Sequence, residues 1–110
     1  MSALATALRS IVGDDACLSG PEELFVYQCD ALTLHSGEPL AVVLPRSRDQ
    51  VQQVVRACRE HGVAFVPRGA GTGLSGGALA DGGVVIECSR MNRIVEVNAE
   101  DRYAIVEPGV

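Results

Sequence analysis

The residues best suited to chemistry form a glycine-rich segment that follows a short apolar strand. Residues 65–77 read Phe-Val-Pro-Arg-Gly-Ala-Gly-Thr-Gly-Leu-Ser-Gly-Gly, with five glycines. Glycine loses more backbone entropy on ordering than any other residue, so a plain connection rarely contains so many. A backbone without Cβ atoms can approach an anion closely and turn successive N–H groups toward it. The segment therefore predicts a phosphate-binding loop, to which the hydroxyls of Thr72 and Ser75 could add donors.

Two other interpretations of the glycine-rich segment stay open, and a third is excluded. The ATPase and kinase loop needs a lysine, and all nine basic residues are arginines. The dinucleotide motif Gly-x-Gly-x-x-Gly matches at Gly69 and Gly71 but meets Leu74 at its third position, and no helix can follow directly. Glu87 does lie near the distance expected of a ribose-binding acid. A flexible connection without a ligand is the remaining alternative.

Other chemically active side chains give weaker signals. Ser75 lies within a Gly-x-Ser-x-Gly string, but a hydrolase nucleophile would directly follow its strand and directly precede a helix. His35 and His61 have no metal ligand at suitable spacing, so we interpret both as structural. Arg68 suits a phosphate or a nearby carboxylate such as Glu107 equally well.

Composition limits the class of protein. The chain has 110 residues, 47% of them hydrophobic, which is enough for one small domain with an aliphatic core. Its net charge of −5 argues against nucleic-acid binding. No stretch approaches the length of a membrane span. The four cysteines have no metal-ligand spacing and the start lacks a secretory leader, so we expect free thiols in a cytoplasmic protein.

The first forty residues predict an N-terminal extension of helix and loop, residues 1–40. Ala- and Leu-rich spacing predicts a helix over residues 3–12, ended by Gly13. Asp14 could begin a second short helix. Residues 19–40 contain Gly20-Pro21 and read mainly as loop.

The clearest helix follows a buried strand at residues 41–44. Ser47 and Gln50 form a capping box, and we expect the helix to run over residues 48–61. Gly62 would end it. The side chains expected to face the core share helical spacing: Val51, Val54, Val55 and Cys58.

A second strand at residues 63–66 would complete a βαβ unit, in which a helix joins two parallel strands. The glycine-rich loop then leaves the carboxyl end of that strand, the edge at which open α/β sheets bind ligands. A third strand is expected at residues 83–87. Residues 93–97 and 103–107 predict a hairpin. The fold class is therefore α/β (α+β).

Four segments in order carry a resemblance to a known family. They are Pro45-Arg46-Ser47, the stretch from Val66 to Ala78, Arg90-Met91-Asn92-Arg93-Ile94, and Val106-Glu107-Pro108-Gly109-Val110. Together they resemble the N-terminal part of the FAD-linked oxidases, in the group of the glycolate oxidase D-subunit and D-lactate dehydrogenase. The resemblance identifies residues 41–110 as the first FAD-binding subdomain of a longer protein, a reading that the Pro-Gly turn at the end also favours.

The resemblance implies a cofactor site. The loop would wrap the FAD pyrophosphate mainly through backbone N–H groups, and Gly109 would approach the flavin. Some relatives attach FAD through a histidine where this chain has Thr72, so we expect non-covalent FAD. The loop residues implied in the site are Arg68, Gly69, Ala70, Gly71, Thr72, Ser75 and Gly76.

The resemblance also implies a reaction: hydride transfer from C2 of a small 2-hydroxy acid, such as glycolate or D-lactate, to flavin N5. Catalytic residues are expected beyond Val110, so this fragment alone should be inactive. Other oxidase subunits are possible partners and could attach a cytoplasmic protein to a membrane. The alternatives are a stand-alone nucleotide- or phosphate-binding module without catalysis and a small structural α/β domain.

Overall fold

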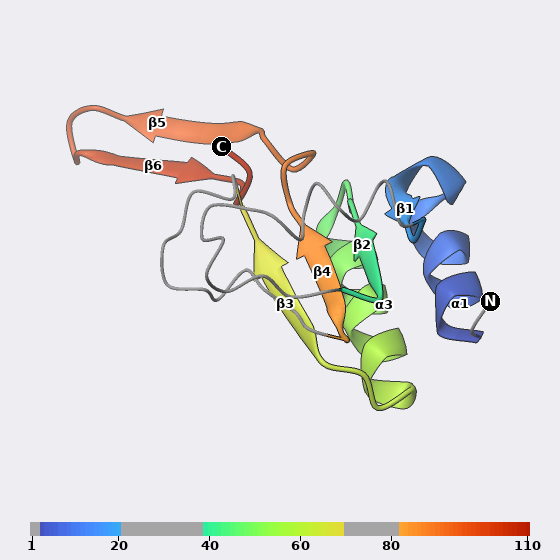
Figure 1. The fold of residues 1–110 in the computed structure, drawn as a ribbon. Coiled ribbons are helices and arrows are strands. Elements are labelled where there is room, and N and C mark those ends of the chain that lie inside the picture. Colours follow the sequence, from blue (N-terminus) through green and yellow to red (C-terminus); the bar gives the residue numbers. More distant parts are fainter. Residues whose placement is uncertain (1–2, 21–38, 70–81) are drawn as a thin grey trace, which may run out of the picture.

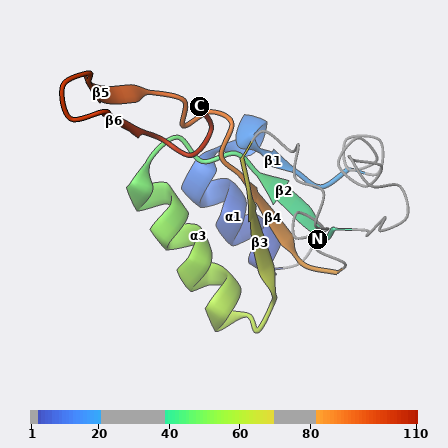
Figure 2. The ribbon, with the colours of Figure 1, turned by 90° about the vertical axis from the view of Figure 1, so that its left-hand side faces the viewer.

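The computed structural model describes residues 3–20, 39–69 and 82–110. They form an α/β body, in which two helices pack on a four-stranded sheet, and a β-hairpin that projects from it (Figure 1). Both helices lie on the same face of the sheet (Figure 2). The predicted α/β class is confirmed.

The N-terminal segment contributes a helix and a strand to the body. Helix α1 spans Ala3–Val12 as predicted and buries Leu4 and Leu8. Gly13 follows it at φ 97°, and its N–H donates to the Arg9 carbonyl at 2.8 Å. A 3-10 turn, η1 (Asp14–Ala16), then leads into strand β1 (Cys17–Leu18), which the sequence did not indicate. Residues 21–38 of the predicted loop lie outside the described residues.

Helix α3 (Arg48–Glu60) follows strand β2 (Ala41–Val43) and confirms the predicted cap. The Ser47 hydroxyl accepts from the Gln50 N–H at 3.2 Å. The Gln50 side chain accepts from the Arg46 N–H at 2.7 Å, one residue before the usual capping-box partner. The predicted core face is confirmed, because Val54 and Cys58 are buried and Val51 and Val55 are half-buried. Ala57 is also buried on this helix.

Strand β3 spans Phe65–Arg68, so the prediction of residues 63–66 was wrong at both ends. The helix C-cap explains the later start. Gly62 adopts φ 65°, and the Val63 N–H donates to the Cys58 carbonyl at 2.9 Å. Residue 63 therefore still belongs to the helix end and cannot start a strand. β3 lies at the sheet edge, where Pro67 is tolerated although it has no N–H to donate.

The sheet order is β1-β2-β4-β3, with β4 spanning Val84–Glu87. β4 pairs in parallel with both β2 and β3, which confirms that these two strands run in the same direction. The sequence did not reveal that β4 would lie between them. One core cluster, with Ala41, Val43, Val84 and Ile86, faces the helices. A second cluster, around Val42 and Val85, lies on the opposite face.

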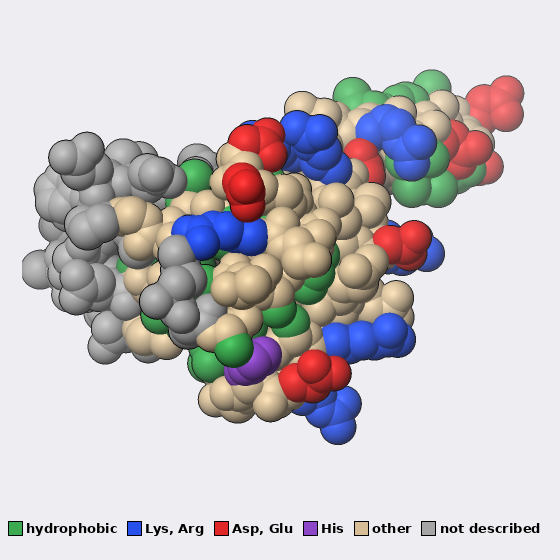
Figure 3. Space-filling view, turned by 90° about the vertical axis from the view of Figure 1, so that its right-hand side faces the viewer, with side chains coloured by type: hydrophobic (Ala, Val, Ile, Leu, Met, Phe, Trp, Pro, Cys, Tyr) green, Lys and Arg blue, Asp and Glu red, His purple; other side chains and the backbone are tan. Residues whose placement is uncertain are grey.

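The predicted hairpin is also confirmed, as strands β5 (Ile94–Asn98) and β6 (Tyr103–Val106). They pair antiparallel, with a register shift between Ile94 and Glu96. At the hairpin base the Arg93 N–H donates to Glu107 Oε1 at 2.9 Å. Hydrophobic side chains gather on the projecting hairpin in the space-filling view (Figure 3).

Within the described ranges, no helix is long and apolar enough to cross a membrane. The same residues hold no cluster of three metal-ligating side chains. Cys17, Cys58 and Cys88 are free thiols, and all three are buried.

Candidate functional site

The candidate site lies at the carboxyl edge of the parallel strands. Because β2, β4 and β3 run in the same direction, their carboxyl ends meet at one edge of the sheet. The glycine-rich loop leaves this edge after Arg68, as predicted. Ala70, Gly71, Thr72, Ser75 and Gly76 lie outside the described residues, so their predicted part in the site stays a prediction.

The fold brings Gly69 and Gly109 into one neighbourhood. A Cβ atom on Gly69 would lie 3.0 Å from the Pro108 carbonyl oxygen. The Gly109 N–H donates to the Met91 carbonyl at 2.9 Å, which seats the C-terminal turn on the turn after β4. Two predicted site residues, far apart in the sequence, are therefore placed together at the carboxyl edge.

Gly109 has a structural reason to be glycine. A Cβ atom there would overlap the Cys88 carbonyl oxygen and lie 2.9 Å from both the Met91 carbonyl oxygen and the Ser89 Cα. Only a residue without a side chain allows the two backbone segments to approach this closely. The predicted approach of Gly109 to the flavin stays a prediction beside this packing role.

Arg68 pairs with Glu87, so the suggestion of Glu107 as its carboxylate partner was wrong. Arg68 Nε lies 3.0 Å from Glu87 Oε2, and the two side chains are 11% and 5% exposed. Glu107 instead pairs with Arg93, at 3.9 Å. The difference follows from strand order, because β4 lies beside β3 and sets Glu87 in register with Arg68.

The sequence suggests only a ribose-binding role for Glu87, whereas the position of Glu87 in the fold indicates another role. The Glu87 carboxylate also accepts a hydrogen bond from the Ser89 N–H at 3.2 Å. Both of its oxygens are thus used within the protein. A signal was present in the sequence, since Glu87 is a charged residue at the end of an otherwise apolar strand, Val84–Glu87.

Cys88 is the thiol closest to this pair in the sequence. Burial raises the pKa of the Cys88 thiol, and the negative charge of Glu87 raises it further, while a backbone hydrogen bond at Arg68 lowers it. The Cys88 N–H donates to the Arg68 carbonyl at 2.8 Å. A thiol held protonated is a poor nucleophile, so Cys88 suits packing rather than covalent chemistry.

Two further arginines follow the strands that end at this edge. Arg46 comes after β2 and Arg90 after β4, and each has a guanidinium nitrogen 3.8 Å from Asp15 Oδ2. Sequence reasoning did not assign them a role, because their proximity depends on the pairing of β2 with β4.

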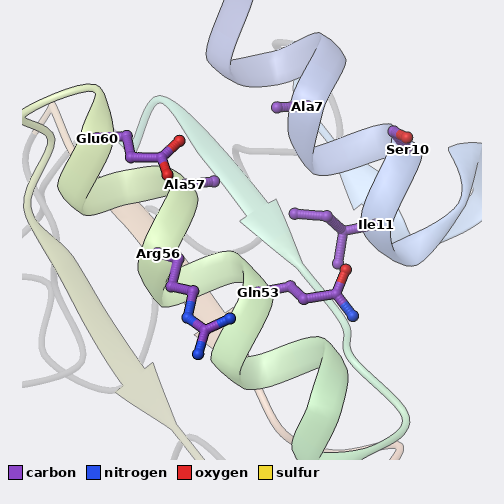
Figure 4. Close-up of a pocket in the computed structure, with 7 residues that line it drawn as sticks. All are labelled: Ala7, Ser10, Ile11, Gln53, Arg56, Ala57 and Glu60. Carbon is purple, nitrogen blue, oxygen red and sulfur yellow. The ribbon is translucent and has the colours of Figure 1, made fainter.

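A shallow groove of about 340 Å³ lies elsewhere, between α1 and α3 (Figure 4). It is lined by Ala7, Ser10, Ile11, Gln53, Arg56, Ala57 and Glu60. No residue from the carboxyl edge of the sheet contributes to it. Its α3 side is formed largely by solvent-exposed polar side chains, such as Arg56 and Glu60. The groove is therefore separate from the candidate site.

Residues 39–110 match the family model described as an FAD binding domain. The chain belongs to this family. The match includes the whole carboxyl edge with Arg68, Gly69, Glu87 and Gly109, and it confirms the family inferred from the sequence.

Curated relatives extend the similarity to most of the chain. It is 43% identical over 105 residues to glycolate oxidase subunit GlcD of Escherichia coli K12, covering 94% of the chain and 21% of that protein. It is 40% identical over 109 residues to D-2-hydroxyglutarate dehydrogenase of Stutzerimonas stutzeri, covering 98% and 24%. The chain thus spans about a fifth to a quarter of the length of these relatives.

Solved structures agree on the fold. A p-cresol methylhydroxylase superposes with a TM-score of 0.84 at 29% identity, covering 97% of this chain and 22% of its own. A 4-ethylphenol oxidase from Gulosibacter chungangensis gives 0.83 at 26% identity, covering 97% and 22%. The body and hairpin described above are therefore the FAD-binding fold of this group of flavoproteins.

The described part of the edge fits a bound pyrophosphate. Gly69 directly follows β3, and because it has no Cβ atom its backbone can lie close to the Pro108 carbonyl oxygen, which a Cβ atom would meet at 3.0 Å. Glu87, which lies opposite Arg68 at the end of β4, is already paired with Arg68 and does not present a lone negative charge. Parallel strand ends followed by a glycine-rich loop are a common setting for phosphate groups of nucleotides.

Proposed function

We propose that this chain is the N-terminal, FAD-binding part of a flavin-dependent oxidoreductase that oxidises a small 2-hydroxy acid of the glycolate or D-lactate type. The observation that carries the proposal is the carboxyl edge at Gly69 and Gly109, which lies within the stretch matching the FAD-binding domain. The substrate class is supported by relatives named glycolate oxidase subunit, D-2-hydroxyglutarate dehydrogenase and D-lactate dehydrogenase.

Bound FAD would accept the hydride from the hydroxy acid. The part of this chain is to hold the cofactor. Backbone N–H groups of residues 68–72, 75 and 76 would bind the pyrophosphate, with the Thr72 and Ser75 hydroxyls as further donors. The family resemblance implies that the cofactor is held without a covalent bond, because some relatives attach FAD through a histidine where this chain has Thr72.

Three further features belong to the same proposal. Residues that touch the substrate would lie outside this chain, which is about a fifth of the length of the glycolate oxidase subunits. Partner subunits are supported by the word "subunit" in that name. We place the protein in the cytoplasm, where its buried free cysteines would remain reduced.

The cofactor is tested with the full-length gene product, by flavin absorbance per chain after purification. We expect one non-covalent FAD, released on acid precipitation. Gly71→Val should fold, as judged by circular dichroism, yet purify without flavin, because a branched side chain blocks approach of the backbone to the phosphates. Thr72→Ala is the mild control and should weaken FAD binding by about 1 kcal/mol, the contribution of one hydrogen bond. Full flavin content in folded Gly71→Val would contradict the loop as the phosphate site.

The reaction is tested with glycolate, D-lactate and D-2-hydroxyglutarate and an artificial electron acceptor. The full-length protein should oxidise at least one of them, and this chain alone should oxidise none above the rate of free FAD. A full-length protein that binds FAD but oxidises no 2-hydroxy acid would contradict the substrate class. Nucleotide binding by this chain in a gene product without oxidase activity would favour the alternative, a binding module without catalysis.

A further inference from the structure

Arg68 and Glu87 form a buried ion pair at the point where the chain leaves β3 for the glycine-rich loop. They are the last residues of β3 and β4 and lie opposite each other in the parallel register. The distance from Arg68 Nε to Glu87 Oε2 is 3.0 Å. The chain enters the loop immediately after Arg68, so this contact is the last described side-chain anchor before the loop.

Glu87 links three backbone segments at this point. One carboxylate oxygen faces the Arg68 guanidinium on β3, and the other accepts from the Ser89 N–H in the turn after β4. The Met91 carbonyl of the same turn accepts a hydrogen bond from the Gly109 N–H. A single buried carboxylate therefore fixes the end of β3 relative to the segment that carries Gly109.

The charge balance of the pair decides between two roles for Arg68. An arginine that serves as counter-ion to a phosphate needs its positive charge available to the ligand. The charge of Arg68 is matched by Glu87 in a nearly solvent-free position, where separating the two ions would be costly. Arg68 is therefore better placed to hold the loop start than to neutralise a pyrophosphate.

We propose that Glu87 is a positioning residue for the cofactor loop: through its ion pair with Arg68 it fixes the end of β3, so that Gly69 starts the loop in its phosphate-binding place. This inference rests on the proposed FAD-binding function. It predicts that FAD affinity depends on the pair as a unit, and not on the positive charge of Arg68 by itself.

The direction in which FAD affinity changes in one variant, Glu87→Gln, separates the two roles. Glu87→Gln removes the negative charge and leaves Arg68 without its counter-ion. If Arg68 were a direct phosphate ligand, FAD would bind as tightly as before or more tightly, because the competing carboxylate is gone. If Glu87 positions the loop, FAD affinity should fall about tenfold, as expected when one member of a coupled pair is removed. Glu60→Gln, on the exposed face of α3, is the matched control and should bind FAD like the wild type.

Exchanging the two charged residues should restore the FAD affinity that a single substitution removes. Arg68→Glu alone places two carboxylates together and should weaken FAD binding by about a hundredfold. The double variant Arg68→Glu/Glu87→Arg restores an ion pair across the same two strand ends and should recover affinity to within about tenfold of the wild type. A lost phosphate ligand would not be recovered in this way.

The measurement is FAD titration of the full-length apoprotein by flavin fluorescence, on variants shown to be folded by circular dichroism. Unchanged or tighter binding by Glu87→Gln would overturn the positioning role. The positioning role would also be overturned if the double variant Arg68→Glu/Glu87→Arg bound FAD as weakly as Arg68→Glu alone. This comparison remains available if Glu87→Gln does not fold. A wild-type protein that binds no FAD would instead refute the proposed function and the positioning role together, so the two failures are distinguishable.

Discussion

The body and the hairpin use similar residues with opposite results. β4 reads Val-Val-Ile-Glu and is buried throughout, whereas β6 reads Tyr-Ala-Ile-Val and is exposed throughout. In the body, β4 lies between two parallel strands and under two helices. The hairpin extends away from that core (Figure 1). Apolar composition alone therefore does not decide burial; the layers around a strand do.

The cross-strand register sorts the hairpin side chains. Ile94 lies opposite Val106 and Val97 opposite Ala104, so one face of the hairpin is entirely apolar at these positions. Exposed side chains of this kind contribute little to stability in water, and an isolated two-stranded hairpin is marginal there. The body should thus unfold cooperatively, while the hairpin should respond weakly to changes in its side chains.

A matched isoleucine pair should give the largest difference. Ile86 in β4 is 2% exposed and Ile105 in β6 is 50% exposed. Ile86→Ala should destabilise the chain by about 3–4 kcal/mol, because it leaves a cavity in the core. Ile105→Ala should cost less than about 1 kcal/mol. Urea unfolding followed by far-ultraviolet circular dichroism measures both, and similar losses would refute the contrast between body and hairpin.

The junction between the two regions should show the next largest effect. Gly109→Ala forces a Cβ atom into the turn after β4 and should cost roughly 3 kcal/mol, at the upper end of ordinary overpacking. Gly62→Ala is the control, since its Cβ would meet nothing within 4 Å and only its φ of 65° is unfavourable. That strain should cost about 1 kcal/mol. Equal losses in urea unfolding would mean that the C-terminal turn yields easily.

Removing one local hydrogen bond from each region should give a smaller difference in stability of the same kind. Ser47→Ala removes the cap of α3 in the body and should cost about 1 kcal/mol. Asn98→Ala removes the side-chain acceptor of the Asp101 N–H, an exposed bond of 2.9 Å in the hairpin turn. It should cost about 0.5 kcal/mol, the lower end for a single hydrogen bond. Thermal unfolding would contradict this order if Asn98→Ala proved the more damaging change.

The smallest effect should appear only in alkaline solution. Burial raises the pKa of the Cys58 thiol, and burial together with Glu87 raises that of Cys88. Both thiols thus stay protonated in the folded chain while the unfolded chain ionises above about pH 8.5. The stability they contribute is complete below that pH and is lost as the pH rises toward their folded pKa values.

The measurement for the thiols is the free energy of unfolding at several points between about pH 8 and pH 10. Cys58→Ala lowers stability at every pH by making a cavity, but the decline with rising pH should be flatter than in the wild type. An identical slope in both proteins would show that Cys58 does not take part.

Sequence patterns predicted the elements whose signals are local. The capping residue Ser47 and the spacing of Val51, Val54 and Cys58 define α3 within a dozen residues, and the hairpin turn is equally self-contained. The start of β3 was misplaced because the helix cap extends to Val63, which a strand propensity does not reveal.

The site was predictable only in its backbone features. The glycines at 69 and 109 marked places of close approach, and the structure brings them together. The partner of Arg68 was not predictable, because Glu87 reaches it only through the insertion of β4 beside β3. Neighbour relations of this kind depend on the whole sheet and leave no mark in the spacing of nearby residues.

The central place of β4 has a consequence for biosynthesis. β4 is the last strand of the four-stranded sheet to leave the ribosome, yet among the described strands it is the one paired with both β2 and β3. Until Val84–Glu87 has emerged, β3 has no strand to bond to, although α3 and the β1–β2 pair can already form. A nascent chain that has emerged only as far as the glycine-rich segment therefore displays an unpaired apolar strand edge, which exposes this stage of synthesis to aggregation.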